Sequence, residues 1–138
     1  MMSDRIVKDF AQPVYNCTFA FATGAEDHSS CTITVKDQIG NTIGEVQPLL
    51  VWMSSVSTGE GLATTGPVSL AALATGGTYL QELTSKKCAI VLTNGSGQFI
   101  LDIEDDTTMT EYVCASPLAG KSGFINVSRV MSAADFGV

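Results

Sequence analysis

Basic residues are scarce in this chain. Its 138 residues include only 7 lysines and arginines against 14 acidic residues, which gives a formal net charge of −7. Binding to nucleic acid requires clustered cations that displace counterions from phosphates, and the only adjacent basic pair is Lys86-Lys87. We therefore expect no nucleic-acid partner and no anionic membrane partner, and we attribute the acidic excess to solubility.

Long hydrophobic runs are missing as well. No stretch approaches the roughly 18 apolar residues of a membrane span. Residues 1–9 carry charges where a signal peptide would have its apolar core. We expect a protein that is made and folded in a cytoplasm and has no membrane partner.

Histidine occurs once, and common catalytic motifs are absent from the sequence. His28 is expected in a polar loop at residues 23–30, beside Asp27, Ser29 and Ser30. A Ser-His-Asp arrangement needs these groups on a rigid support, so an exposed loop histidine is favoured over a catalytic one. There is no Gly-x-Ser-x-Gly elbow and no GxxxxGK phosphate loop. We expect no catalytic residue and no cofactor, and infer that the chain is not an enzyme.

Metal and disulfide chemistry have little support. The cysteines form no CxxC pair, and they are Cys17, Cys31, Cys88 and Cys114. Each lies in an apolar strand-like segment, so buried free thiols are favoured, with a disulfide as the alternative. Asp102, Glu104 and Asp106 would share one strand face and could contribute to a Ca²⁺ site. A solvated acidic edge that discourages strand pairing is favoured instead, and no metal site is expected.

Alternating apolar residues and turn residues dominate what is present. Residues 34–43 and 92–101 each run from an apolar alternation into Asp, Asn and Gly and back to β-branched or aromatic positions. This pattern predicts an all-β, antiparallel sandwich, immunoglobulin-like or jelly-roll, of about eight strands with little helix. The expected strands are 14–21, 31–36, 48–53, 78–83, 86–93, 98–104, 111–115 and 124–131. Residues 68–74 fit a strand and a short helix equally well.

The chain divides into an N-terminal arm at 1–12, a sandwich at 13–131 and a C-terminal tail at 132–138. The nearly continuous apolar run at 48–53 indicates a strand covered on both faces or lying in an interface. We expect the contacts of a homo-oligomer, a dimer or trimer, to come from this run, the arm and the loop at 55–66. The candidate interface residues are Leu50, Trp52, Met53, Ile6, Val7 and Phe10.

The segments Cys31–Ile43 and Ala89–Ile103 resemble bacterial immunoglobulin-like repeats. Their pattern has a V-x-D-x-x-G-N element early and a T-D/N-x-x-G element later, which this chain matches at Val35–Asn41 and Thr93–Gly97. The usual glycine-valine element after the first phrase is replaced here by Gln47-Pro48-Leu49-Leu50. The resemblance implies a β-sandwich.

The chain as a whole is similar to small virion proteins of tailed bacteriophages. The similarity lies in the order of four segments, Val51–Ser54, Gly76–Leu80, Leu92–Gly97 and Ser132–Gly137. It implies a capsid decoration or cement protein that is made in the host cytoplasm, binds the major capsid protein and resides on the virion surface. The alternatives are a tail-fibre or adhesin-type module that binds a host glycan or protein, and a small jelly-roll lyase or hydrolase, which would lack the usual histidine cluster.

Overall fold

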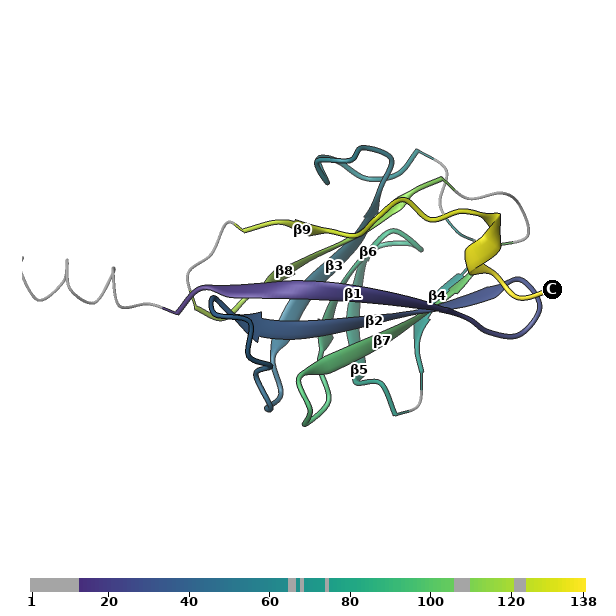
Figure 1. The fold of residues 1–138 in the computed structure, drawn as a ribbon. Helices are drawn as coiled ribbons and strands as arrows, with labels where there is room; N and C mark the ends of the chain where they lie inside the picture. The colour runs from purple at the N-terminus through teal and green to yellow at the C-terminus, as the bar shows by residue number, and fades with distance from the viewer. Residues whose placement is uncertain (1–12, 65–66, 68, 74, 106–109, 121–123) are drawn as a thin grey trace, which may run out of the picture.

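Figure 1 shows the computed structural model, in which two antiparallel β-sheets pack face to face. The structure describes residues 13–64, 67, 69–73, 75–105, 110–120 and 124–138. The strands are β1 (Tyr15–Thr23), β2 (His28–Asp37), β3 (Pro48–Ser54), β4 (Ser69–Ala72), β5 (Thr78–Thr84), β6 (Cys88–Leu92), β7 (Gln98–Glu104), β8 (Tyr112–Pro117) and β9 (Asn126–Val127), followed by the short 3-10 helix η1 (Ala133–Asp135). The prediction of an all-β sandwich is confirmed.

One sheet has the order β1-β2-β7-β4 and the other has the order β5-β6-β3-β8-β9. All pairs of neighbouring strands are antiparallel. The apolar run at 48–53 forms β3, which lies in the middle of the five-stranded sheet between β6 and β8. This central position explains why the run contains no charge, since both neighbours and one sheet face shield it from water.

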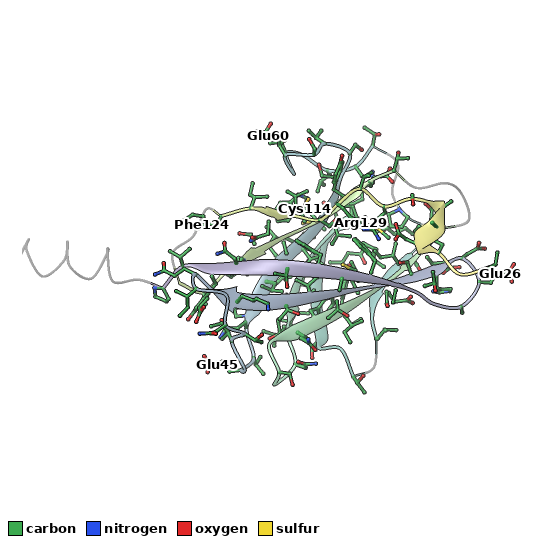
Figure 2. All side chains as sticks on the ribbon, in the orientation of Figure 1. Glu26, Glu45, Glu60, Cys114, Phe124 and Arg129 are labelled. Atoms are coloured by element: carbon green, nitrogen blue, oxygen red, sulfur yellow. The ribbon has the colours of Figure 1, made fainter. Side chains whose placement is uncertain are left out.

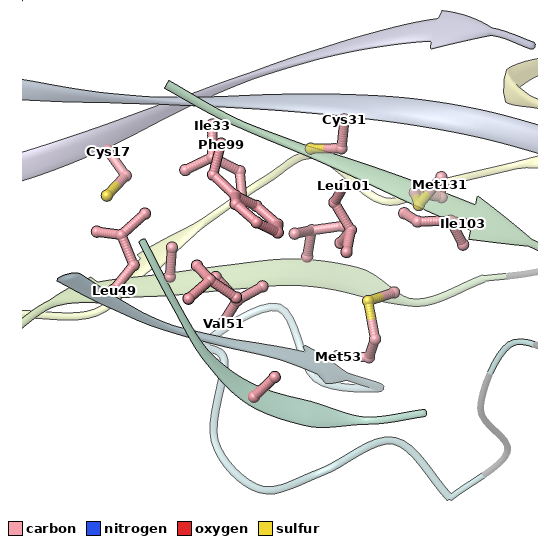
Figure 3. Packing of buried hydrophobic residues seen from close by; sticks show 14 of the residues in the cluster. Cys17, Cys31, Ile33, Leu49, Val51, Met53, Phe99, Leu101, Ile103 and Met131 are labelled. Atoms are coloured by element: carbon pink, nitrogen blue, oxygen red, sulfur yellow. The ribbon is translucent and has the colours of Figure 1, made fainter. Parts of the chain in front are cut away.

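The core lies between the sheets and contains the inward side chains of alternate positions, because successive residues of a strand point to opposite faces. Figure 3 shows Phe99 and Leu101 of one sheet facing Leu49 and Val51 of the other. Phe99, Leu101 and Leu49 are fully buried. Each such side chain contributes about 1.5–3 kcal/mol to stability, so this layer is the main stabilising element of the fold.

The two turn segments recognised in the sequence use the same hydrogen-bonding arrangement. Asp37 Oδ1 accepts hydrogen bonds from the backbone N–H groups of Ile39 (3.1 Å) and Asn41 (2.9 Å). Asn94 Oδ1 accepts from those of Ser96 (2.9 Å) and Gln98 (3.2 Å). In each turn the third residue after the Asp or Asn is a glycine with positive φ, Gly40 or Gly97. The predicted turns are therefore confirmed, and side-chain capping of the backbone explains them.

The structure resolves one ambiguous segment and shortens one expected strand. Residues 69–72 form β4, which pairs with β7, so the strand alternative for this segment is correct. The strand expected at 124–131 is reduced to the two residues of β9. Beyond β9, Ser128 N–H donates to Val113 O and Met131 N–H donates to Glu111 O, each at 2.9 Å. The backbone therefore stays beside β8 without a regular ladder.

Residues 132–138, expected to form a tail, pack against the sandwich. Phe136 contacts the core, and Asp135 is buried. Arg129 donates two hydrogen bonds to the Asp135 carboxylate, one of them at 2.9 Å, and this guanidinium lowers the pKa of Asp135. Gly137 bridges to Glu26 in the β1–β2 hairpin. The C-terminal segment is thus held by an ion pair and by backbone hydrogen bonds.

Candidate interaction surface

The outer face of the five-stranded sheet is apolar at its centre. Its central outward residues are Leu50 and Trp52 on β3, Cys88, Ile90 and Leu92 on β6, and Cys114 on β8. Leu50 pairs directly with Ile90, and Trp52 lies between Cys88 and Cys114. An antiparallel sheet with one solvated face usually carries polar residues on that face. We call this set of six residues the apolar face.

The loop at 55–64, the covering loop, lies over part of the apolar face. Trp52 Nε1–H donates a 2.9 Å hydrogen bond to Gly59 O, and Ser54 Oγ–H donates a 3.1 Å hydrogen bond to Glu60 O. Gly59 has a φ of 79°, and a Cβ atom at this position would lie 2.9 Å from methyl groups of Ile125 and Val127. The loop is therefore fixed against the sheet at a position that only glycine fits.

A hollow of about 500 Å³ remains beside the covering loop. Its apolar lining comes from Leu50, Trp52, Leu62, Cys88 and Ile125, and Ser116, Gly59, Glu60 and Gly61 complete it. Leu62 and Ile125 are 41% and 50% exposed at its rim. An exposed apolar hollow of this kind is typical of a binding surface, because a partner that fills it removes apolar area from water.

The predicted interface residues occupy different environments. Leu50 is half-buried on the apolar face, and Trp52 lies on the same face but is only 8% exposed because the covering loop packs on it. Met53 is fully buried in the core, so its side chain offers no surface to a partner, contrary to its assignment to the interface. Ile6, Val7 and Phe10 lie outside the described residues.

The outer face of the four-stranded sheet is polar by comparison. Its outward residues include Thr18 on β1, Thr32 and Thr34 on β2, and Asp102 and Glu104 on β7. Figure 2 shows Glu26, Glu45 and Glu60 at the periphery of the molecule. The sandwich therefore has one polar and one apolar outer face, with these three glutamates on the loops around them.

The structure corrects the expected loop position of His28. The hairpin loop spans only 24–27, and His28 is the first residue of β2. Its Nδ1 lies 3.0 and 3.2 Å from the two carboxylate oxygens of Asp102 on β7. Asp27 and Ser29, considered as possible partners from the sequence, make no hydrogen bond with the ring. The neighbouring strand supplies the partner because His28 and Asp102 project from the same outer face.

The expected acidic edge is also corrected. β7 lies between β2 and β4 and is therefore an interior strand. Asp102 bonds to His28, and Glu104 accepts a 2.9 Å hydrogen bond from Ser69 Oγ. Asp106 lies outside the described residues. Within the described ranges, no group of three or more His, Cys, Asp or Glu residues is arranged to hold a metal ion.

We expect Asp102→Asn to lower the pKa of His28, which the hydrogen bond to Asp102 raises above its ordinary value of 6.5. The raised pKa means that protonated His28 stabilises the fold below the pKa of the unfolded chain. This stabilisation is lost as the pH rises through the folded pKa. The effect of Asp102→Asn on the free energy of unfolding should accordingly be larger at about pH 5 than at about pH 8. Titration of the His28 ring protons by NMR tests the shift, and an identical pKa in both proteins would contradict it.

All four cysteines are free thiols, as favoured from the sequence. Burial raises the pKa of Cys17 and of Cys114 to about 12. Burial also raises the pKa of Cys88, whose side chain is half-buried on the apolar face. Protonated thiols are poor nucleophiles, so Cys88 and Cys114 serve the apolar face as small hydrophobic groups.

Two residues of this surface were not among the interface residues expected from the sequence. Leu62 lies in the loop at 55–66 and Ile125 in the strand expected at 124–131, but neither residue was singled out. The part of the chain that the structure describes contains no helix able to span a bilayer. Comparison of the chain with family models, with curated proteins and with solved structures gave no match.

Proposed function

We propose that this protein is a non-catalytic structural protein, a capsid decoration or cement protein of a bacteriophage, that attaches to major capsid subunits through its apolar face. The observation that carries the proposal is the apolar outer face of an otherwise weakly charged sandwich, with the hollow beside Leu50 and Trp52. The similarity of the sequence to small phage virion proteins supplies the partner.

Attachment through this face follows from burial of apolar surface. Each square ångström of apolar area removed from water contributes about 25 cal/mol. The hollow is a concave site that an apolar side chain of the major capsid protein would fill. Many copies on one shell engage many equivalent sites, and linked copies gain affinity without new contacts. A modest single contact is therefore sufficient for stable decoration.

The direct test mixes the purified full-length protein with intact virions or expanded heads of the phage that encodes it. Pelleting of the particles should carry the protein down at a fixed, high copy number that saturates with concentration. Absence from the pellet, combined with specific binding on a glycan array, would replace this proposal with the alternative of a module that binds the host surface.

Ile90→Lys is expected to weaken this attachment by at least about tenfold, which corresponds to about 1.4 kcal/mol. Ile90 lies at the centre of the apolar face, and a lysine there would lose its hydration when the partner covers the face. The matched control is Thr32→Lys, which places the same charge on a central strand of the opposite outer face. Equal loss of attachment in both variants would show that net charge, and not this face, controls binding.

A further inference from the structure

The four edge strands of the two sheets differ in how open they are to pairing. β4 has four residues and β9 has two. The pairing of β5 with β6 has two register shifts, and β5 carries Glu82. Short strands, irregular register and charges are devices by which proteins block edge-to-edge association. These three edges are therefore protected.

β1 has none of these devices. Its nine residues, Tyr15–Thr23, contain no charged residue and no proline, and they pair with β2 in an unbroken register. Figure 1 shows β1 running along the side of the four-stranded sheet, next to β9. A long, regular and uncharged edge is a ready template for another strand, so its pairing capacity requires an explanation.

The hairpin geometry identifies which backbone groups of β1 are free. Gly24 N–H donates to His28 O, which makes this pair the hydrogen-bonded type. Because the two types of pair alternate along an antiparallel ladder, the even-numbered residues of β1 bond to β2. The N–H and C=O groups of Cys17, Phe19 and Phe21 therefore point away from β2. No described residue bonds to them on that side.

There is space for a second strand beside these groups. A groove of about 630 Å³ runs along residues 17–21, with Val127, Ser128 and Arg129 on its other side. Phe19 and Phe21 are only partly buried there, and the Arg129 guanidinium carbon lies 4.7 Å from the centre of the Phe21 ring. Figure 2 shows Arg129 beside β1. Since Arg129 is already paired with Asp135, the groove has no free charge that would select an acidic peptide.

We propose that β1 pairs antiparallel with β1 of a second copy about a two-fold axis at Phe19. In this register Phe19 faces Phe19 of the second copy, and Cys17 faces its Phe21. All of these are odd-numbered positions whose backbone N–H and C=O groups point outward. Each strand therefore supplies hydrogen-bond partners to the other, as an isologous contact requires. The absence of charge in β1 lets two chains of net charge −7 approach at this edge. The result is a dimer with a continuous eight-stranded sheet, formed independently of the apolar face.

The register can be tested on the full-length chain by charge exchange at two exposed, outward positions. In the proposed dimer Thr18 of one copy lies opposite Ala20 of the other. The double variant Thr18→Lys/Ala20→Lys places lysine against lysine, whereas Thr18→Lys/Ala20→Asp places lysine against aspartate. Like charges directly opposite destabilise a strand pair, and opposite charges stabilise it. Both variants leave the core and the β2 ladder unchanged.

Sedimentation velocity over a concentration series gives the outcome. The unmodified protein should show a monomer–dimer equilibrium, the Lys/Lys variant should weaken it at least tenfold, and the Lys/Asp variant should retain it. Thr32→Lys, one strand away, should have no effect on the dimer. Ile90→Lys should weaken shell attachment and leave the dimer intact, which separates the two contacts. A monomer at all concentrations, or equal dimerisation of the two double variants, overturns the proposal. Loss of the dimer only upon substitution of Ile6 and Phe10 would identify residues 1–12 as the occupant of the groove and would also overturn it.

Discussion

Gly97→Ala is expected to lower the free energy of unfolding by about 2–4 kcal/mol. Gly97 has a φ of 72°, and a Cβ atom added there would lie 1.9 Å from Ile43 O. The backbone would have to move, because no flexible side chain can yield at this point. Movement would also disturb the 2.9 Å hydrogen bond from Val35 N–H to Gly97 O. The two turn segments therefore meet at Gly97 and Ile43, where only the hydrogen atom of a glycine side chain fits.

The matched control lies two residues away in the same turn. Gly95 has no heavy atom within 4 Å of an added Cβ and has no positive φ. Gly95→Ala should change stability by less than about 1 kcal/mol. Equilibrium unfolding in urea, followed by Trp52 fluorescence, measures both variants. Equal stability of the two would show that the contact between Gly97 and Ile43 is not rigid.

Phe99→Ala is expected to lower the free energy of unfolding by about 3–5 kcal/mol. Phe99 is among the largest fully buried side chains, and the core residues around it come from both sheets. Its truncation removes buried apolar area and leaves a cavity that the surrounding strands cannot close. Domains are stable by only about 5–15 kcal/mol, so the variant would lose a large share of its stability.

Gln98→Ala serves as the control on the same strand. The Gln98 side chain points to the opposite face and donates a 3.4 Å hydrogen bond to Thr34 Oγ1, while its backbone bonds do not depend on the side chain. It should cost no more than about 1 kcal/mol. Chemical denaturation measures both variants. Comparing the dependence of the unfolding free energy on denaturant concentration with that of the unmodified protein separates a loss of stability from a change in the unfolded chain. A loss below about 1.5 kcal/mol for Phe99→Ala would contradict the tightly packed core.

The sequence was sufficient to predict features that depend on neighbouring residues. The turns at Asp37 and Asn94 were predicted correctly, because a short polar side chain bonding to the backbone a few residues ahead is a local interaction. The alternation of apolar residues also predicted the bounds of most strands to within a few residues. Residues 68–74 stayed open because so short an apolar segment does not distinguish the helical period from the strand period.

Alternation did not indicate which face of a strand is buried. Cys31 and Ile33 on β2 point into the core, whereas Cys88 and Ile90 show the same spacing on β6 but lie on the outer face. The intervening residues of β6 are also apolar, so both faces look alike in the sequence. For the same reason Met53 was assigned to the interface with Trp52, although adjacent residues point in opposite directions.

Register between distant strands was equally inaccessible from one sequence. His28 and Asp102 are separated by 74 positions and meet only because β2 and β7 align as they do. The sequence therefore offered nearby Asp27 as a partner, and the structure supplied a distant one. The uncharged edge of β1 was visible as a composition, but its position at the border of a sheet was not.

The hydrogen bonds of Gly137 have a consequence for biosynthesis. Asp27 N–H donates to Gly137 O, and Gly137 N–H donates to His28 O, each at 3.0 Å. The β1–β2 hairpin can therefore complete its bonding only after Gly137 has been translated. Late closure of this kind favours slow folding, and until then the hairpin lacks these bonds while it is accessible to chaperones and to neighbouring nascent copies.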